Sequence, residues 1–335
     1  MASTYAGSGV DLAAVKPIQD KINSVLGKTS NAFTPVALPG HYAGLFQVGA
    51  QKMTVHCDGV GSKILVAQDL NRHDTIGIDA VAMNANDIVC LGSRPIVGVD
   101  YLALSKPDEQ LVDEIMKGLV AGCAEAGVAL VGGETAMLPD MIKGAKKYAH
   151  ADYDLAMTVV GTLDGEAVTG SKMKEGDVLL GLASSGLHSN GYTLARKTLE
   201  VEEWGEEMLT PTRLYVRPVL EMCKTGKVRG LAHITGGAFS KLSRIGKYAK
   251  VGFELTGMPK PEGIFAELQK RIGAAREIYR TFNMGVGMVV VCSPDDAQAL
   301  MAIAGRHKIE VGEIGSVVRG SDVKIDVGGR MVSLL

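Results

Sequence analysis

The stretch from Met53 to Asp87, MTVHCDGVGSKILVAQDLNRHDTIGIDAVAMNAND, decides how the rest of the chain is interpreted. The alternation in MTVHC predicts a strand over residues 52–57, and this strand runs into the glycine turn DGVGSK. Helices are predicted over 62–70 and 78–91, the second rich in small residues and ending in an Asn-Asp pair. Asp58 and Asp87 therefore stand at the ends of predicted elements.

These two carboxylates suit a magnesium-nucleotide site, because Mg²⁺ is usually bound by one or two carboxylates together with phosphate oxygens. The turn beside Asp58 also carries Lys63, but it lacks the GxxxxGK spacing of a P-loop. On a helix, Asp79 and Asn86 face nearly the same way, and Asp87 follows Asp79 by two steps of four residues. The alternative interpretation is a buried helix of small residues with capping polar groups.

Composition restricts the class of protein. The 335 residues allow two domains of ordinary size, and a share of 46% hydrophobic against 21% charged residues is typical of a globular chain. The formal net charge is -2 and no lysine or arginine block exceeds a pair, which argues against nucleic acid as a partner. Five cysteines without a CxxC pair favour reduced thiols. The start of the chain lacks the pattern of a signal peptide, and no apolar run reaches the roughly 18 residues of a membrane span. We therefore expect a cytoplasmic protein without a membrane partner.

Strand and helix patterns alternate in both halves of the chain. Further strands are predicted over 95–104 and 153–163, and a helix between Pro107 and Gly127 has both a start and a stop signal. TPTRLYVRPVLEMCKTG predicts a helix with an N-cap threonine. Neighbouring strands look hairpin-like, which favours an α+β class with two domains, residues 1–165 and 166–335, over one doubly wound sheet.

Three polar turns add candidate binding residues. GGET places Glu134 at a strand end beside two glycines, where it could join a metal or remain a surface glutamate. SSGLHSNGY (184–192) sets hydroxyls, an amide and His188 at a helix start, where backbone N–H groups bind phosphate well. The alternative is an N-cap with a satisfied histidine. HITGG (233–237) has the same character, and Asn283 precedes the glycine-spaced strand GVGM.

An ordered set of motifs resembles one family. YAGSGVD, DGVGSK, RHDTIGIDAVAMNANDI, VDYLAL, GGETA, YDLA, GDVLLGLASSGLHSNGY, LTPTRLYV, AHITGG and RTFNMGVGM follow one another as they do in the aminoimidazole ribonucleotide synthetases, also called phosphoribosylformylglycinamidine cyclo-ligases. HSNGY, PTRLYV and RTFN separate this family from its relatives.

The resemblance implies a fold and a reaction. The family fold has two α+β domains, and the N-terminal sheets of a homodimer pair into a central barrel. The implied reaction uses ATP to close the imidazole ring of aminoimidazole ribonucleotide from formylglycinamidine ribonucleotide, with ADP and phosphate released. This is a C–N ligase of purine biosynthesis with Mg²⁺ as cofactor, and K⁺ is a further candidate ion.

The resemblance also assigns residues by type of contact. Metal binding falls to Asp58, Asp87 and Glu134, and the catalytic candidates are His188 for proton transfer, Asp87 and Lys63. ATP binding falls to Asp58, Gly59, Gly61, Ser62, Lys63, Asn86, Asp87 and Glu134, with Asn86 orienting a metal-bound water. Substrate binding falls to Ser184, Ser185, Gly186, His188, Ser189, Asn190, His233, Thr235, Gly236 and Gly237.

Some positions depart from the family pattern. Met137 replaces the second acid of GGETAEMP, Ser62 replaces a threonine, and the segment 238–244 keeps only Arg244 of the usual sequence. Two other hypotheses stay open: a related ATP-using synthetase of the formylglycinamidine ribonucleotide or selenophosphate type, and a non-catalytic nucleotide-binding scaffold. Selenophosphate synthetases carry a reactive N-terminal cysteine or selenocysteine, and here no cysteine precedes Cys57. The intact acids Asp58, Asp87 and Glu134 argue against a dead scaffold.

Overall fold

The computed structural model describes residues 40–143 and 150–335, together with scattered positions before residue 40. The helical spacing of apolar residues over 11–27 also predicts a helix, but this segment lies largely outside the described residues. None of the helices in the described part of the chain has the length and apolar character of a membrane span.

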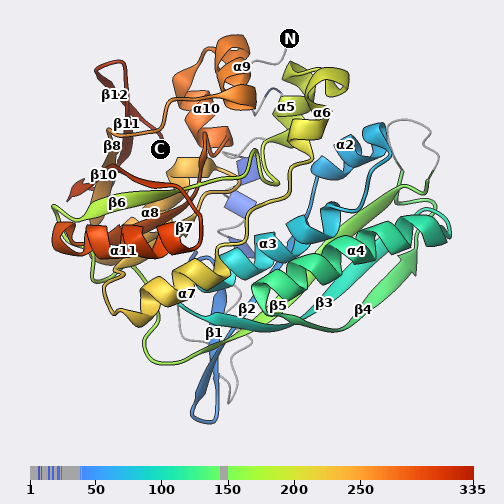
Figure 1. Ribbon diagram of the computed structural model, residues 1–335, viewed down its shortest axis with the longest axis horizontal. Helices are drawn as coiled ribbons and strands as arrows, with labels where there is room; N and C mark the ends of the chain where they lie inside the picture. The colour runs from blue at the N-terminus through green and yellow to red at the C-terminus, as the bar shows by residue number, and fades with distance from the viewer. Residues whose placement is uncertain are drawn as a thin grey trace.

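The first half of the chain builds a five-stranded sheet with the strand order β1-β2-β5-β3-β4 (Figure 1). Its strands are β1 (Gly44–Val48), β2 (Gln51–Gly59), β3 (Arg94–Leu104), β4 (Ala129–Met137) and β5 (Tyr153–Leu163). The pair β3/β4 is parallel, because a helix connects the two strands, and the other pairs are antiparallel. The strands predicted over 52–57, 95–104 and 153–163 are therefore confirmed.

Two long helices, α3 (Ile76–Val89) and α4 (Glu109–Ala126), lie side by side over one face of this sheet, and α2 (Lys63–Leu70) precedes them (Figure 1). Glycines allow α3 and α4 to touch through their backbones. A Cβ atom on Gly118 would lie 2.6 Å from the carbonyl oxygen of Asp74, and one on Gly122 would lie 3.1 Å from Val81 Cβ. We call Gly118 and Gly122 the glycine seam. A larger residue at either position would push the helices apart.

The ends of α4 follow the predicted signals. The Asp108 side chain accepts a hydrogen bond from Leu111 N at 3.1 Å, which caps the first turn. Gly127 ends the helix in the left-handed region with φ of 71°. These two residues fix the limits of a helix whose buried face covers the sheet.

The second half builds a seven-stranded sheet with the order β12-β11-β8-β10-β6-β9-β7. Its strands are β6 (Val178–Ala183), β7 (Gly230–His233), β8 (Val251–Leu255), β9 (Val286–Cys292), β10 (Val311–Arg319), β11 (Val323–Val327) and β12 (Arg330–Ser333). The helical elements are α5 (Tyr192–Thr198), α6 (Val201–Met208), α7 (Val216–Lys224), η2 (Ala238–Lys241), α8 (Leu242–Ala249), α9 (Gly263–Ile272), α10 (Ala275–Thr281) and α11 (Pro294–Arg306). Every residue of β9, which lies between β6 and β7, is buried, so this strand belongs to the core.

One predicted helix starts in the wrong place. The N-cap threonine of TPTRLYVRPVLEMCKTG does not cap a helix, because Thr212 bonds to Asp79 instead and α7 begins only at Val216. The elements α6, α8, α10 and β8 were not predicted at all. All five cysteines are free thiols, and Cys90, Cys123 and Cys292 are buried.

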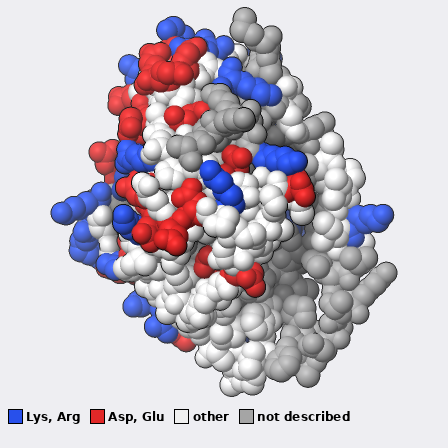
Figure 2. Space-filling model, turned by 90° about the vertical axis from the view of Figure 1, so that its right-hand side faces the viewer, with Lys and Arg blue, Asp and Glu red and all other residues white. Residues whose placement is uncertain are grey.

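No helix among the elements of residues 40–143 and 150–335 covers the other face of the N-terminal sheet (Figure 1). Strand β5 alternates between buried residues and partly exposed ones, as expected for a sheet covered on one side. Four large apolar side chains of β3 and β4 are exposed there or at the strand end, namely Val99, Tyr101, Val131 and Met137. Figure 2 shows a face of the molecule whose lower middle carries few charged side chains. The sheet is open in one chain, so a barrel is not formed by the monomer.

Candidate active site

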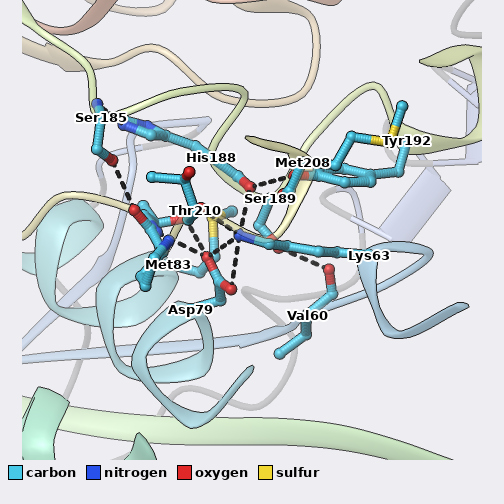
Figure 3. A network of polar contacts seen from close by, with 12 residues as sticks. Val60, Lys63, Asp79, Met83, Ser185, His188, Ser189, Tyr192, Met208 and Thr210 are labelled. Atoms are coloured by element: carbon cyan, nitrogen blue, oxygen red, sulfur yellow. Dashed lines mark hydrogen bonds and ion pairs between the residues drawn. The ribbon is translucent and has the colours of Figure 1, made fainter. Parts of the chain in front are cut away.

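A buried ion pair joins the two halves of the molecule (Figure 3). Lys63, at the start of α2, is completely buried, and its ammonium group lies 2.8 Å from Asp79 Oδ2 of α3. It donates hydrogen bonds to Asp79 Oδ1 at 2.9 Å and to the carbonyl oxygens of His188 at 3.0 Å and Thr210 at 2.7 Å. Because an ammonium group has three hydrogens, these three acceptors use all of them.

Asp79 is hydrogen-bonded through Oδ1, whereas its buried Oδ2 has only the ion-pair contact with Lys63 among the described residues. Its Oδ1 also accepts hydrogen bonds from Thr212 N at 2.8 Å and from Thr212 Oγ1 at 2.5 Å. Burial raises the pKa of Asp79 and lowers the pKa of Lys63, while each partner's charge opposes the shift of the other. We refer to Lys63, Asp79, Thr212 and the two carbonyls as the Lys63–Asp79 network. A phosphate contact by Lys63, as the sequence predicts, would require one of these bonds to be replaced.

Two turns that the sequence placed far apart lie against each other beside this network. Ser189 Oγ donates to the carbonyl oxygen of Val60 at 2.8 Å, and Ser62 Oγ lies 3.1 Å from Thr193 Oγ1 (Figure 3 shows the first contact). The glycine turn DGVGSK and the turn SSGLHSNGY therefore form one surface, built from both halves of the chain.

His188 is more enclosed than the sequence suggested. Its side chain is buried, its φ of 64° lies in the left-handed region, and its Nε2 accepts a hydrogen bond from Ser185 N at 3.2 Å. Its Nδ1 has no hydrogen-bond partner among the described residues. Burial, followed by the charges of His233 and Lys63, lowers the pKa of His188 well below its ordinary value, so the ring is neutral. Proton transfer by His188 stays a prediction, and in this geometry the ring is a weak base.

The turn around Ser184 is held by the RTFN motif. Ser184 Oγ donates to Asn283 Oδ1 at 3.1 Å, and Asn283 Nδ2 donates to the carbonyl oxygen of Gly186 at 2.9 Å. Ser185 Oγ donates to the carbonyl oxygen of Pro211 at 2.6 Å. Asn283 is buried, so its amide fixes the shape of the turn from inside the protein. Sequence reasoning had noted Asn283 without assigning it this support.

The second carboxylate of α3, Asp87, has histidine partners. Its Oδ1 lies 2.7 Å from His233 Nδ1, and its Oδ2 lies 3.3 Å from His56 Nε2. The other ring nitrogen of His56 lies 3.0 Å from Asn84 Oδ1. Burial acts to raise the pKa of Asp87, but the hydrogen bond from His233 and the charge of His56 outweigh it and lower that pKa overall.

Asn86 completes this arrangement. Its Nδ2 donates to the carbonyl oxygen of Arg213 at 2.9 Å and lies 3.3 Å from His233 Nε2, while its Oδ1 accepts from Tyr215 N at 2.9 Å. Both ends of the amide are used inside the protein, which leaves little capacity for the metal-bound water that the sequence predicted. We name Asp87, His56, His233, Asn84 and Asn86 the Asp87–histidine cluster.

Asp58, at the end of β2, has one carboxylate oxygen to spare. Its Oδ1 accepts from Gly59 N at 2.8 Å, and no protein partner of Oδ2 is found in the described part of the chain. Burial raises the pKa of Asp58, the charge of Asp87 raises it further, and His56 and Lys241 oppose this. The charges of Asp87, His56 and Lys241 therefore all act on Asp58.

Glu134 lies elsewhere. It is exposed on β4, and its neighbours across the sheet are Tyr101 of β3 and, beyond it, Ala156 of β5. Since β5 and β3 separate β4 from β2, three strand spacings of about 4.8 Å put Glu134 roughly 14 Å from the end of β2. Among the described residues no three acidic, histidine or cysteine side chains are grouped as a metal site. The predicted set of Asp58, Asp87 and Glu134 is thus not brought together within one chain.

Two cations that sequence reasoning missed face this region. Lys241 donates to Thr235 Oγ1, and its Nζ lies 6.0 Å from the centre of the Tyr42 ring. Arg244 Cζ lies 5.6 Å from the same ring. Burial and the charge of Arg244 lower the pKa of Lys241 to about 8, against the opposing charges of Asp87 and Asp58. Lys241 lies in the part of the segment 238–244 that departs from the family pattern, and Arg244 is the one residue kept there, but the motif comparison gave neither of them a role.

The glycine pair of HITGG allows a close approach. A Cβ atom on Gly236 would lie 2.9 Å from Asn190 Oδ1, and Gly237 has φ of 87°. Asn190 Nδ2 in turn lies 3.7 Å from Met83 Sδ of α3. The turns that carry Asn190 and Gly236 therefore meet over α3, close to the Asp87–histidine cluster.

Known proteins similar to this chain identify its family. Residues 40–163 match the family model described as AIR synthase related protein, N-terminal domain, and residues 174–328 match the model of the C-terminal domain. A phosphoribosylformylglycinamidine cyclo-ligase of Methanocaldococcus jannaschii is 44% identical over 339 aligned positions, which cover 96% of this chain and 93% of the relative. The chain belongs to the AIR synthase family. The family resemblance drawn from its motifs is thereby confirmed.

Solved structures share the fold of this AIR synthase family chain. The structure titled HypE-HypF complex has a TM-score of 0.70 at 20% identity and covers 93% of this chain and 98% of its own. The hydrogenase maturation protein HypE in complex with ATP has a TM-score of 0.63 at 19% identity and covers 97% and 95%. At this identity the structures show a common two-domain α+β fold and nothing about activity.

Proposed function

We propose that this protein catalyses the ATP-dependent closure of formylglycinamidine ribonucleotide to 5-aminoimidazole ribonucleotide, with ADP and phosphate released. The observation that carries the proposal is the 44% identity to a phosphoribosylformylglycinamidine cyclo-ligase over nearly the whole of both chains. The site agrees with it, because two turns, one from each half, meet beside buried carboxylates and cations, as a nucleotide and a phosphorylated substrate require.

The chemistry needs an oxygen to be made a better leaving group. The terminal phosphoryl group of ATP passes to the amide oxygen, the neighbouring nitrogen attacks the activated carbon, and the carbon–oxygen bond breaks to release phosphate. Such a transfer depends chiefly on positioning and charge neutralisation. We assign Lys241 and Arg244 to the neutralisation of phosphate charge, since both are cations beside Asp58 and Asp87.

A magnesium ion fits this site only in a limited form. Both oxygens of Asp87 are engaged by histidines and Glu134 is distant, so a three-carboxylate cage does not fit. Asp58 Oδ2 is available, and one carboxylate together with ATP phosphates is enough for Mg²⁺. The ion would neutralise phosphate charge there. A K⁺ requirement stays a prediction, tested by replacing K⁺ with Na⁺ in the assay.

We further propose a cytoplasmic homodimer whose N-terminal sheets face each other, with residues 1–165 and 166–335 as the two domains. The support is the helix-free sheet face with exposed Val99, Tyr101 and Val131. Light scattering at micromolar concentration should give twice the mass of one chain. Tyr101→Lys combined with Val131→Lys should produce monomers, and a monomeric wild-type protein would contradict the dimer.

One assay tests the activity. Purified protein is incubated with formylglycinamidine ribonucleotide, ATP and Mg²⁺, and the imidazole product is followed by its coupling to a diazonium dye. A reaction without the ribonucleotide measures idle ATP hydrolysis. We expect product in proportion to ADP in the complete mixture. ADP without imidazole product would reject the proposed function.

A further inference from the structure

A cavity of about 340 Å³ lies between the two halves, and no member of the Lys63–Asp79 network or of the Asp87–histidine cluster lines it. Its wall combines Glu125 at the end of α4, the segment from Arg213 to Pro218 at the start of α7, and His307 and Ile309 after α11. This volume is at the lower end of the range for small-molecule sites, roughly 300–1,000 Å³. The family motif PTRLYV supplies Arg213, Leu214 and Val216 to the wall, and neither the proposed ATP site nor the proposed substrate turns use its arginine.

The charges on the wall are unbalanced. Arg213 and Arg217 both line the cavity, and neither forms an ion pair with any described residue. Arg213 Nε is buried without a hydrogen-bond partner in the described part of the chain. Arg217 Nη2 has one contact, a donated hydrogen bond to the carbonyl oxygen of Ala124 at 3.2 Å. His307 is already paired with Glu221 at 2.7 Å, which leaves Glu125 as the only carboxylate on the wall.

We propose that this cavity binds a phosphate monoester through the guanidinium groups of Arg213 and Arg217. Two unpaired guanidinium groups match a ligand of charge near −2, which a phosphate monoester carries at neutral pH and a single carboxylate does not. The planar fork of arginine fits phosphate oxygens in bidentate geometry. A donor nitrogen buried without a partner is costly, and a bound oxyanion would satisfy Arg213 Nε.

The cavity is connected to the candidate active site through the backbone that carries Arg213. Asn86 of the Asp87–histidine cluster holds both the carbonyl oxygen of Arg213 and the N–H group of Tyr215. The charge of Arg213 also contributes to the lowered pKa of His188. A ligand that moves Arg213 would therefore pull on the same segment that Asn86 holds.

Binding is tested without turnover, so the result does not depend on the proposed activity. Ribose 5-phosphate and inorganic phosphate are titrated calorimetrically into the full-length protein in the absence of ATP and Mg²⁺, with ribose as the ligand that lacks the charge. We expect Arg213→Met and Arg217→Met each to weaken ribose 5-phosphate binding about tenfold or more, because a hydrogen bond to a charged group is lost. Glu125→Gln should tighten binding several-fold, since it removes the opposing charge. Lys224→Met, at the far end of α7, is the matched control and should bind like wild type.

Several outcomes would overturn the proposal: no binding of ribose 5-phosphate by wild type, equal binding by the arginine variants, or equal binding by ribose. Arg217 is exposed and Glu125→Gln adds no bulk, so these variants decide the matter even if Arg213→Met fails to fold. Steady-state kinetics then identify the source of the phosphate. A KM raised in Arg217→Met for the ribonucleotide but not for ATP assigns the cavity to the substrate's own 5′-phosphate. Unchanged KM values together with lost ribose 5-phosphate binding assign it to a separate phosphorylated ligand.

Discussion

Helix α3 carries two buried carboxylates with opposite surroundings. Asp79, near its start, faces Lys63 and a threonine, and all its partners hold fixed roles as donors. Asp87, near its end, faces the imidazole rings of His233 and His56. Burial raises the pKa of Asp79, whereas the histidines lower the pKa of Asp87 below its ordinary value. Two acids on one helix thus have different surroundings: Asp79 bonds to the second half of the molecule, and Asp87 is the one predicted to take part in the reaction.

The largest effect on stability should come from breaking the ion pair between Lys63 and Asp79 at the start of α3. Lys63→Met leaves Asp79 buried without its cation, and the loss of one member of a buried pair costs about 3–5 kcal/mol of unfolding free energy. Urea unfolding measures this from the midpoint at constant slope.

The double variant Lys63→Met with Asp79→Leu tests whether Lys63→Met loses stability because it leaves the Asp79 carboxylate buried without a partner. It should recover much of the lost stability, because apolar replacement of a buried pair is often close to neutral. A single variant as stable as wild type would show that Lys63 does not hold the two halves together.

At the end of α3, a change to Asp87 should reduce ATP turnover. Asp87→Asn keeps the shape of the side chain but removes the charge between His56 and His233, and we expect ATP turnover to fall about 100-fold or more while the fold survives. ADP release and far-UV circular dichroism measure the two properties. Near-normal kcat in this variant, with magnesium as the only metal, would remove the distinction between the two acids.

A titration tests the first end of α3 again, through His73 just before it. His73 is buried with its Nδ1 2.9 Å from Tyr153 Oη, and burial lowers its pKa to about 4. The unfolded chain takes up a proton near pH 6.5 and the folded chain only near pH 4, so stability should decline as the pH falls through this window.

In the variant His73→Gln, the slope of unfolding free energy against pH should be smaller by up to about 1.4 kcal/mol per pH unit, the contribution of one proton. His41, whose burial also lowers its pKa to about 4, should keep part of the slope in the variant. Urea midpoints measured from pH 7.5 to 4 provide the comparison. An unchanged slope would mean that His73 is protonated in the folded protein.

The smallest effect concerns a single hydrogen bond between the two turns. Ser189→Ala removes the bond from Ser189 Oγ to the carbonyl oxygen of Val60 and should cost about 1 kcal/mol of stability. Ser240→Ala, which removes a bond within one turn, is the control. A raised KM for the ribonucleotide in Ser189→Ala alone would support the predicted substrate contact, and an unchanged stability would show that this bond does not join the turns.

Periodicity and turn chemistry made much of the fold predictable. Strand β5 alternates between buried and partly exposed residues, and α4 has a cap at each end, so the sequence contained their limits. The start of α7 was missed because Thr212, which looks like an N-cap, donates hydrogen bonds from both its N–H and its hydroxyl group to Asp79. That residue is 133 positions away. Such a tertiary bond leaves no local trace.

The site was predictable as a set of turns but not as a geometry. Motifs named Asp58, Asp87 and the turns that meet beside them. The separation of Glu134 from Asp58 depends on strand order, and the burial of His188 depends on the packing of both halves. Lys241 lies in a segment that departs from the family pattern except at Arg244, and only the fold shows that both cations face Tyr42.

The glycine seam between α3 and α4 has a consequence for catalysis. Where backbones touch at Gly118 and Gly122, no side chain is available to rearrange and absorb a sliding motion. Helix α3 is therefore held rigidly between α4 and the sheet, and the distance between Asp79 and Asp87 along the helix is fixed. If the protein closes over a nucleotide, the elements that approach α3 must move, above all the turns after β6 and β7. Helix α3 itself would stay in place.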